Sequence, residues 1–149
     1  MHFSDLNLNK PLLKAIFEKN YETPTKVQIQ TIPLVLAKKN VIASAQTGTG
    51  KTAAFALPIL QLLFHQLDTN KEQKKIRALI VSPTRELAVQ INEEFTDYSK
   101  YTKLSSTVVY GGISIDAQKK VLKKGVDILI ATPGRLLELC KQEIVDLST

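Results

Sequence analysis

Four short runs rich in aliphatic and β-branched residues, each followed by a helix-forming segment, constrain the fold of this chain most. The runs cover residues 41–43, 78–81, 106–110 and 126–131, and the helices predicted after them cover about 51–65, 85–98, 114–122 and 134–140. Strands that alternate with helices in this way form a parallel sheet. We therefore expect an α/β fold in which helices cover both faces of a parallel sheet.

Two further helices are predicted before the first strand. One begins around Pro11 and carries Leu12, Leu13, Ile16 and Phe17 on one face, and the other runs from Thr25 towards Ala37. Proline fits the first turn of a helix because its missing N–H has no partner there, and threonine is a frequent N-cap. We expect both helices to pack through their apolar faces.

A glycine-rich run, Ala-Gln-Thr-Gly-Thr-Gly-Lys-Thr at residues 45–52, lies between the first predicted strand and its helix. Glycines let backbone N–H groups turn towards a phosphate, Lys51 brings a positive charge, and the Thr52 hydroxyl can bind Mg²⁺. The general motif has glycine where this chain has Ala45. A plain glycine turn gives no reason for Lys-Thr to open an apolar helix, so we expect this loop to bind a nucleoside triphosphate.

Composition and length agree with one soluble domain. The chain has 149 residues, of which 44% are hydrophobic and 23% charged, typical of a globular protein that can bury a core. No apolar run reaches the roughly 18 residues of a membrane span. The polar N-terminus does not resemble a secretion signal, so we expect a cytoplasmic protein. Cys140 is the only cysteine, which excludes an internal disulfide.

The net charge of +6 suits a polyanionic partner, but it also suits a merely soluble basic protein. Basic residues gather at 119–124 and in the polar stretch 68–77, where they are Lys71, Lys74, Lys75 and Arg77. Charge runs are usually solvated surfaces. We interpret both groups in that way.

The carboxyl ends of parallel strands share one edge of the sheet, where ligands bind. After the second, third and fourth runs come Pro-Thr-Arg-Glu-Leu at 83–87, Gly111 with Gly112, and Thr-Pro-Gly-Arg at 132–135. Hydroxyls, arginines, helix N-termini and glycines suit sequence-independent contact with a phosphate-sugar backbone. Each piece alone is equally well explained as a helix cap or a turn.

Together and in this order, the four loops resemble the motifs of the DEAD-box ATP-dependent RNA helicases over nearly the whole chain. Residues 45–52 resemble motif I, 83–87 motif Ia, 111–112 the GG motif and 132–135 motif Ib. Residues 20–28, Asn-Tyr-Glu-Thr-Pro-Thr-Lys-Val-Gln, resemble the Q motif, with Phe3 as its upstream aromatic residue. The resemblance implies a RecA-like P-loop fold, ATP and Mg²⁺ as cofactors, and RNA as a partner.

The Q motif selects adenine in this family. A glutamine amide such as that of Gln28 matches the N7 acceptor and N6 donor of adenine, and the Tyr21 ring can stack on the base. The family usually has glycine at the position of Asn20, and asparagine also suits a left-handed turn. Thr25 to Gln28 is equally a capping box, in which Gln28 turns back to the Thr25 N–H. The sequence leaves both roles of Gln28 open.

The resemblance implies two sets of site residues. Expected nucleotide-binding residues are Phe3, Tyr21, Thr25, Gln28, Gln46, Thr47, Gly48, Thr49, Gly50, Lys51 and Thr52, with Lys51 and Thr52 also catalytic and Thr52 binding Mg²⁺ through the nucleotide. Expected RNA-binding residues are Pro83, Thr84, Arg85, Gly111, Gly112, Thr132, Pro133, Gly134 and Arg135.

The family's Asp-Glu-Ala-Asp motif, which supplies carboxylates for the Mg²⁺ complex and the attacking water, does not occur in the 149 residues. Glu86 and Asp116 suit helix first turns better than that role. The Ser-Ala-Thr motif and the second RecA-like domain are also missing. We therefore expect residues 1–149 to be the amino-terminal part of RecA-like domain 1, truncated before the DEAD-motif strand and inactive alone, of a parent that uses ATP to unwind or remodel RNA.

Two other functions stay open from the sequence alone. One is part of another P-loop ATPase, such as a DNA helicase, and the other is a stand-alone nucleotide- or RNA-binding module without turnover. Expected partners are RNA and the second RecA-like domain of the same parent, without a membrane. An unpaired strand edge beside the phosphate loop also predicts self-association of the fragment.

Overall fold

The computed structural model describes residues 1–66 and 75–148. These residues form two compact units. The first unit contains residues 1–66 and 94–103, and the second unit contains residues 75–93 and 104–148. The boundary falls within helix α4 (Arg85–Ser99), so this one helix contributes to both units.

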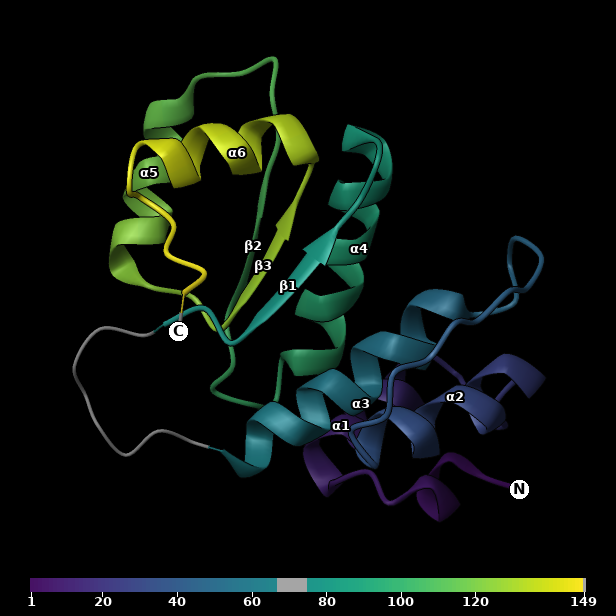
Figure 1. The fold of residues 1–149 in the computed structure, drawn as a ribbon. Coiled ribbons are helices and arrows are strands. Elements are labelled where there is room, and N and C mark those ends of the chain that lie inside the picture. Colours follow the sequence, from purple (N-terminus) through teal and green to yellow (C-terminus); the bar gives the residue numbers. More distant parts are fainter. Residues whose placement is uncertain (67–74, 149) are drawn as a thin grey trace. The chain divides into compact units, whose positions relative to one another are not determined.

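The first unit is helical. It contains the 3-10 helix η1 (Phe3–Leu6), helices α1 (Lys10–Glu18), α2 (Lys26–Leu36) and α3 (Lys51–His65), and the last turns of α4 (Figure 1). Asn9 caps α1 by accepting the Leu12 N–H at 3.0 Å, and Pro11 lies in the first turn as expected. Among the most buried side chains of this unit are Leu12, Ile16, Ile32, Leu57, Leu60 and Phe95.

The apolar face predicted for α1 is only partly correct. Leu12, Ala15 and Ile16 are buried, whereas the Phe17 side chain is 78% exposed. One residue step rotates the direction of a side chain by about 100° around a helix, so Phe17 follows Ile16 away from the buried stripe. The hydrophobic character of Phe17 suggested the core, but helix geometry places it at the surface.

Residues 41–43, predicted as the first strand, do not form one. They are not in a helix or strand, and the Ile42 side chain is fully exposed at 102%. A strand exists only when its backbone N–H and C=O groups pair with a neighbour. Among the described residues, the sheet has three strands, all from the second unit. The β-branched composition was therefore correctly recognised, but the pairing partner is not among the described residues.

The second unit contains the predicted parallel sheet. Strands β1 (Ala78–Val81), β2 (Ser106–Val109) and β3 (Ile128–Ala131) are arranged in the order β1-β3-β2, and both pairs are parallel. All residues of β3 are buried, whereas β1 at the edge alternates between half-buried and exposed residues. The uninterrupted Ile-Leu-Ile-Ala sequence of β3 is typical of a strand that is covered on both faces.

Helices cover the sheet as the alternating pattern predicted. Helices α5 (Ile115–Lys124) and α6 (Pro133–Lys141) lie on one side of the strands, and the N-terminal part of α4 lies on the other (Figure 1). Leu136 and Leu139 of α6 pack on Val109, Leu129 and Ala131 of the sheet. Apart from residues 41–43, the helix and strand bounds agree with the predicted ones to within about two residues.

Asp127 joins the amino ends of all three strands. Its carboxylate accepts the Arg77 guanidinium at 3.0 Å and the Ser105 backbone N–H at 2.9 Å, and its own carbonyl accepts the N–H groups of Arg77 and Ala78. The Asp127 side chain is only 8% exposed. Removing one partner of a buried ion pair costs about 3–5 kcal/mol because the other charge is left buried and unpaired, so loss of either partner is more costly here than at a surface ion pair.

Arg77 therefore differs from the solvated residue that the charge run predicted. Its side chain is 19% exposed because it pairs with Asp127. Lys75 is exposed, as are most of the lysines at 119–124, whereas Lys71 and Lys74 lie outside the described residues. Among residues 1–66 and 75–148, none of the helices combines the length and apolar character that a bilayer crossing requires.

Candidate functional site

The glycine-rich loop before α3 has the backbone that the sequence predicted. Gly48 and Gly50 have φ values of +78° and +79°, a left-handed conformation that side chains disfavour. Left-handed residues that alternate with right-handed ones turn successive N–H groups towards one side, which is how backbone loops bind anions. The Thr49 hydroxyl donates to the Gln46 carbonyl at 2.7 Å, and Lys51 Nζ donates to the Ala45 carbonyl. The loop is thus held closed around the first residue of α3.

The segment that precedes α2 also adopts its predicted turn. Asn20 has φ +58°, so asparagine does take the left-handed conformation for which the family uses glycine. The Asn20 N–H donates to the Phe17 carbonyl at 2.9 Å, and the Tyr21 N–H donates to the Ile16 carbonyl at 3.3 Å. These bonds end α1 and fix the backbone from which the Tyr21 side chain extends.

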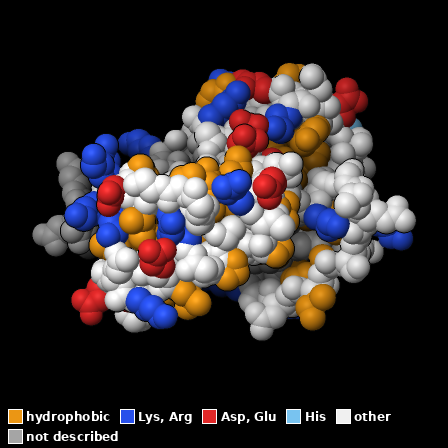
Figure 2. All heavy atoms as spheres, turned by 90° about the horizontal axis from the view of Figure 1, so that it is seen from above, with side chains coloured by type: hydrophobic (Ala, Val, Ile, Leu, Met, Phe, Trp, Pro, Cys, Tyr) orange, Lys and Arg blue, Asp and Glu red, His pale blue; other side chains and the backbone are white. Residues whose placement is uncertain are grey.

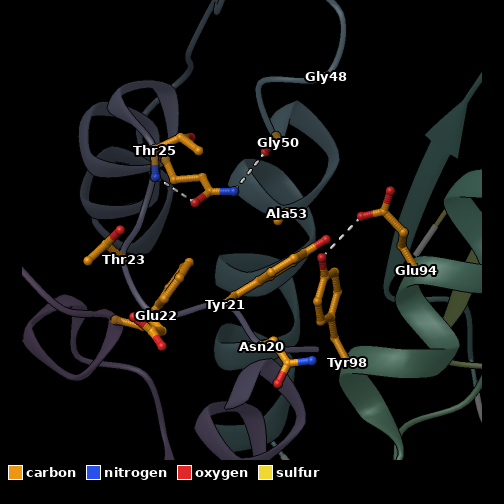
Figure 3. A pocket seen from close by; sticks show the side chains of 12 residues that line it. Asn20, Tyr21, Glu22, Thr23, Thr25, Gly48, Gly50, Ala53, Glu94 and Tyr98 are labelled. Atoms are coloured by element: carbon orange, nitrogen blue, oxygen red, sulfur yellow. Dashed lines mark hydrogen bonds between the residues drawn. The ribbon is translucent and has the colours of Figure 1, made fainter. Parts of the chain in front are cut away.

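Two side chains of the Q-like segment connect α2 to the phosphate loop. The Thr25 hydroxyl donates to the Thr49 carbonyl at 2.8 Å. The Gln28 amide accepts the Thr25 N–H at 2.9 Å through Oε1 and donates to the Gly50 carbonyl at 3.1 Å through Nε2 (Figure 3). The Gln28 side chain is almost fully buried, at 3% exposure. The capping box considered from the sequence is therefore present, and it extends to the loop.

The cap does not exhaust the hydrogen-bonding capacity of Gln28. A glutamine amide has two N–H donors and two acceptor lone pairs. The contacts with Thr25 and Gly50 use one acceptor and one donor, which leaves one of each. That remaining pair is the combination that the N6 and N7 edge of adenine requires. The two roles left open by the sequence are therefore chemically compatible.

A cavity of 540 Å³ opens between these elements within the first unit. Its lining includes Phe3, Tyr21, Thr25, Gln28, Gly48 and Gly50, all of them predicted nucleotide-binding residues. A wider hollow of 1090 Å³ lies between α2 and residues 41–46, and Gln46 and Thr49 line it together with Thr25 and Gly48. Lys51 and Thr52 are half-buried in the first turn of α3, and Thr47 is exposed. All predicted nucleotide residues thus belong to one unit.

Two further residues of the cavity wall were missed by the sequence reasoning. Glu94 and Tyr98 come from the C-terminal half of α4 and line the cavity across from Thr25 (Figure 3). The Tyr98 hydroxyl donates to Glu94 Oε2 at 3.2 Å. Burial raises the pKa of Glu94 and of Tyr98 above their ordinary values. The only signal in the sequence was their i, i+4 spacing, which also fits an ordinary helix surface.

The predicted RNA-binding residues all lie in the second unit, at one edge of the sheet. Val81, Ala131 and Val109 are register partners, so the three strands end level with one another. The three motifs that follow are therefore brought together, as the sequence predicted. Their exposed members are Pro83, Thr84, Arg85, Gly111, Gly112, Pro133 and Gly134, and Thr132 and Arg135 are half-buried.

Gly112 lies close to the Arg85 side chain. Gly112 has φ +85°, and a Cβ at this position would lie 3.0 Å from Arg85 Nη1. The Arg85 guanidinium also lies 5.7 Å from the centre of the Tyr110 ring, within the range of a cation-π contact. Glycine at 112 therefore leaves the space that Arg85 occupies at the start of α4.

Arg135 is held in place by internal contacts. Its guanidinium donates to the Gln118 side chain, the Ile113 carbonyl and the Glu138 carboxylate, each at 3.0 Å, and its side chain is 9% exposed. Gln118 in turn donates to the Tyr110 carbonyl at 3.0 Å. Three of the five guanidinium N–H groups are thus used inside the unit. Arg135 fixes the loop that contains Gly111 and Gly112.

Figure 2 shows a face on which charges of both signs are mixed. Seen from above, Lys and Arg side chains are interspersed with acidic and hydrophobic ones (Figure 2). Individual hydroxyls, arginines and helix N-termini are the groups offered at the strand ends.

Comparison with known proteins identifies the family. The model of the DEAD/DEAH box helicase family matches residues 25–149. The chain belongs to this family. DEAD-box ATP-dependent RNA helicase RhpA of Helicobacter pylori is 46% identical over 95% of this chain. ATP-dependent RNA helicase CshA of Limosilactobacillus reuteri is 50% identical over 99% of it.

Solved structures show the same helicase fold. A hypothetical ATP-dependent RNA helicase from Sulfolobus tokodaii is 40% identical over 95% of this chain, with a TM-score of 0.83. A DEAD box protein from Methanococcus jannaschii is 38% identical over 99% of it, with a TM-score of 0.86. This chain covers 27% of RhpA, 28% of CshA and 39% of each of these two structures.

The contact between Gly50 and Gln28 gives a direct test of the loop. A Cβ at Gly50 would lie 2.3 Å from Gln28 Nε2, whereas a Cβ at Gly48 meets no atom within 4 Å. Both positions have left-handed φ, so both alanine variants carry a strain of about 1–2 kcal/mol. We expect Gly50→Ala to lose about 1 kcal/mol of unfolding free energy beyond this strain, because the Gln28 hydrogen bond must break.

Urea unfolding of the two variants beside the parent chain measures this difference, with Gly48→Ala as the matched control. Equal losses of unfolding free energy in the two variants would contradict the proposed role of the Gln28 contact.

Proposed function

We propose that residues 1–149 form the amino-terminal part of one RecA-like domain, and that this part binds ATP and RNA for an ATP-dependent RNA helicase. The observation that carries this proposal is the buried Gln28 amide, which bridges the α2 cap and the Gly50 carbonyl. The Gln28 side chain, which can pair with adenine, is thereby bonded to a glycine-rich loop of the phosphate-binding type. Both line one cavity. RhpA and CshA, named as ATP-dependent RNA helicases, support the assignment.

For the nucleotide, each group has a distinct proposed role. Gln28 reads the base, Tyr21 stacks on it, and Phe3 packs behind them in the cavity wall. The backbone of residues 46–50 donates to the phosphates, and Lys51 places its ammonium group on their oxygens. The Thr52 hydroxyl, half-buried in the first turn of α3, fits an Mg²⁺ ion bound with the nucleotide. Mg²⁺ would neutralise phosphate charge during transfer.

For RNA, the proposed contacts are the groups at the level strand ends. Arg85 and the hydroxyls of Thr84 and Thr132 donate to phosphate oxygens, and the helix N-terminus at Pro133 and Gly134 adds backbone N–H groups. Pro83, Gly111 and Gly112 let the RNA backbone approach closely. Arg135 holds the chain beside Gly111 and Gly112 through its bond to the Ile113 carbonyl, and its guanidinium has two further N–H groups that could donate to RNA. None of these contacts requires a base edge, so binding is sequence-independent.

We further propose that residues 1–149 bind ATP without turning it over. Hydrolysis needs a carboxylate for the metal complex and another group to orient the attacking water. Glu86 and Asp116 lie in the first turns of α4 and α5, as predicted. Among the described residues, no group of three or more His, Cys, Asp or Glu side chains could hold a metal ion. The parent helicase would add the missing groups and its second RecA-like domain.

The nucleotide assignment is tested by Lys51→Ala, with exposed Lys39→Ala as the control of equal charge. We expect isothermal titration with Mg-ATP to show binding about ten- to hundredfold weaker in Lys51→Ala, because a hydrogen bond to a charged group contributes about 1.5–3 kcal/mol. Lys39→Ala should match the parent chain. Equal affinity in all three proteins would refute the phosphate-loop role, and RNA-stimulated release of phosphate by residues 1–149 would refute the absence of turnover.

The RNA assignment is tested by Arg85→Ala, with exposed Lys120→Ala of α5 as the control. We expect Arg85→Ala to weaken binding of single-stranded RNA to a similar extent for unrelated sequences and to lower the salt dependence by about one unit of slope, because one phosphate contact is lost. Filter binding at several salt concentrations measures both quantities. If Lys120→Ala has the same effect, general surface charge and not this edge binds the RNA.

We also propose that the unpaired segment 41–43 associates with a second copy of this chain. Its exposed Ile42 and its unpaired state are typical of an edge that takes another strand. We expect light scattering to show a mass that rises with concentration and returns to that of a monomer in Ile42→Lys. Phe17→Lys, which removes an exposed side chain from α1, is the control and should still associate. A monomer at all concentrations of the parent chain would exclude the association.

A further inference from the structure

The cavity wall formed by α4 contains a hydroxyl-carboxylate pair that the proposed nucleotide contacts do not use. The Tyr98 hydroxyl donates to Glu94 Oε2 at 3.2 Å, one helical turn earlier. Tyr98 is completely buried, whereas Tyr21 on the facing side of the cavity is 43% exposed. A buried phenol normally requires a hydrogen-bond partner, which Glu94 supplies. The question is what this pair does for the cavity.

The pair reaches the hydroxyl of Tyr21. Figure 3 shows the Tyr21 ring extending across the cavity. Its hydroxyl group is directed towards the Tyr98 hydroxyl and the Glu94 carboxylate. After the larger effect of burial, the Glu94 carboxylate and the Tyr21 hydroxyl both raise the pKa of Tyr98. Because the single Tyr98 proton is donated to Glu94, the lone pairs of the Tyr98 oxygen remain as acceptors for a neighbouring hydroxyl such as that of Tyr21.

Tyr98 is itself rigidly held. Lys19 Nζ lies 5.4 Å from the centre of the Tyr98 ring, and Lys19 forms an ion pair with Asp97 at 2.6 Å. The Tyr21 backbone is fixed separately, through its N–H bond to the Ile16 carbonyl. The half-exposed Tyr21 ring therefore extends from the turn after α1 towards the hydroxyl of a buried residue of α4 (Figure 3).

We propose that Tyr98 and Glu94 are positioning residues that orient the Tyr21 ring for stacking on the base of a bound adenine nucleotide. This inference rests on the proposed nucleotide function of the cavity. Stacking requires the ring to present its face to the base, and a ring that is free to rotate must be ordered when the nucleotide binds. Ordering one free side chain weakens binding by a factor of about two to ten. Contact of the Tyr21 hydroxyl with Tyr98 and Glu94 orders the ring before the nucleotide binds, so this loss of affinity is avoided.

The test compares the affinities of the full chain for Mg-ATP and for tripolyphosphate, measured by isothermal titration. The variants are Tyr21→Phe, Tyr98→Phe and the double variant, each of which keeps its aromatic rings. Tyr101→Phe is the matched control, since Tyr101, which follows the end of α4, also donates its hydroxyl to a carboxylate, that of Glu18, and does not line the cavity. Tripolyphosphate has no base and reports on the phosphate loop alone.

We expect Tyr21→Phe and Tyr98→Phe each to weaken Mg-ATP binding about two- to tenfold and to leave tripolyphosphate binding unchanged, because only the base contact depends on the ring. The double variant should be no weaker than either single one, since both remove the same contact between the Tyr21 and Tyr98 hydroxyl groups. Glu94→Gln, which keeps an acceptor, should retain most of the affinity. Tyr101→Phe should match the parent chain.

Three results would overturn the inference. They are unchanged Mg-ATP affinity in Tyr98→Phe, equal weakening of Mg-ATP and tripolyphosphate, and additive losses in the double variant. If the parent chain binds Mg-ATP no better than tripolyphosphate, the base does not bind in this cavity and the proposed nucleotide function fails together with the inference. If only the positioning role fails, the parent chain still binds Mg-ATP more tightly than tripolyphosphate.

Discussion

The Gln28 amide is the contact on which the nucleotide cavity depends. Its bond to the Gly50 carbonyl connects the start of α2 to the start of α3, two elements separated in sequence by the whole phosphate loop. The bond joins the α2 side of the cavity to its glycine-rich loop side. It also explains why residue 50 is glycine, since a Cβ there would overlap the Gln28 amide. The buried Gln28 side chain thus requires glycine at position 50.

The second unit depends on a different constraint, the register of its parallel strands. Because β1, β3 and β2 end level with one another, three loops that are far apart in the sequence open at one edge. Asp127 fixes the opposite ends of the same strands. The strand ends then need only short loops and helix N-termini to present polar groups. This arrangement explains why the motifs of this unit are small residues, hydroxyls and arginines.

Arginine has different roles at two of these strand ends. Arg85 is exposed and lies beside Gly112, with its side chain over Tyr110. Arg135 is almost covered and holds the chain at Ile113 through hydrogen bonds. Sequence motifs treat both as basic residues that bind a polyanion. The structure separates a residue that faces solvent from one that supports the loop, a distinction that depends on packing.

The sequence by itself determined the local features of this protein. Glycines 48 and 50, the Asn20 turn, the caps and the alternation of strands with helices are decided by backbone sterics and by residues within one turn of each other, so they were predicted correctly. Tertiary structure alone decided which elements meet. It left residues 41–43 unpaired, exposed Phe17, paired Arg77 with Asp127 and brought Glu94 and Tyr98 to the cavity. These outcomes depend on contacts between distant segments, and a periodic pattern contains no information about which partner a segment will meet.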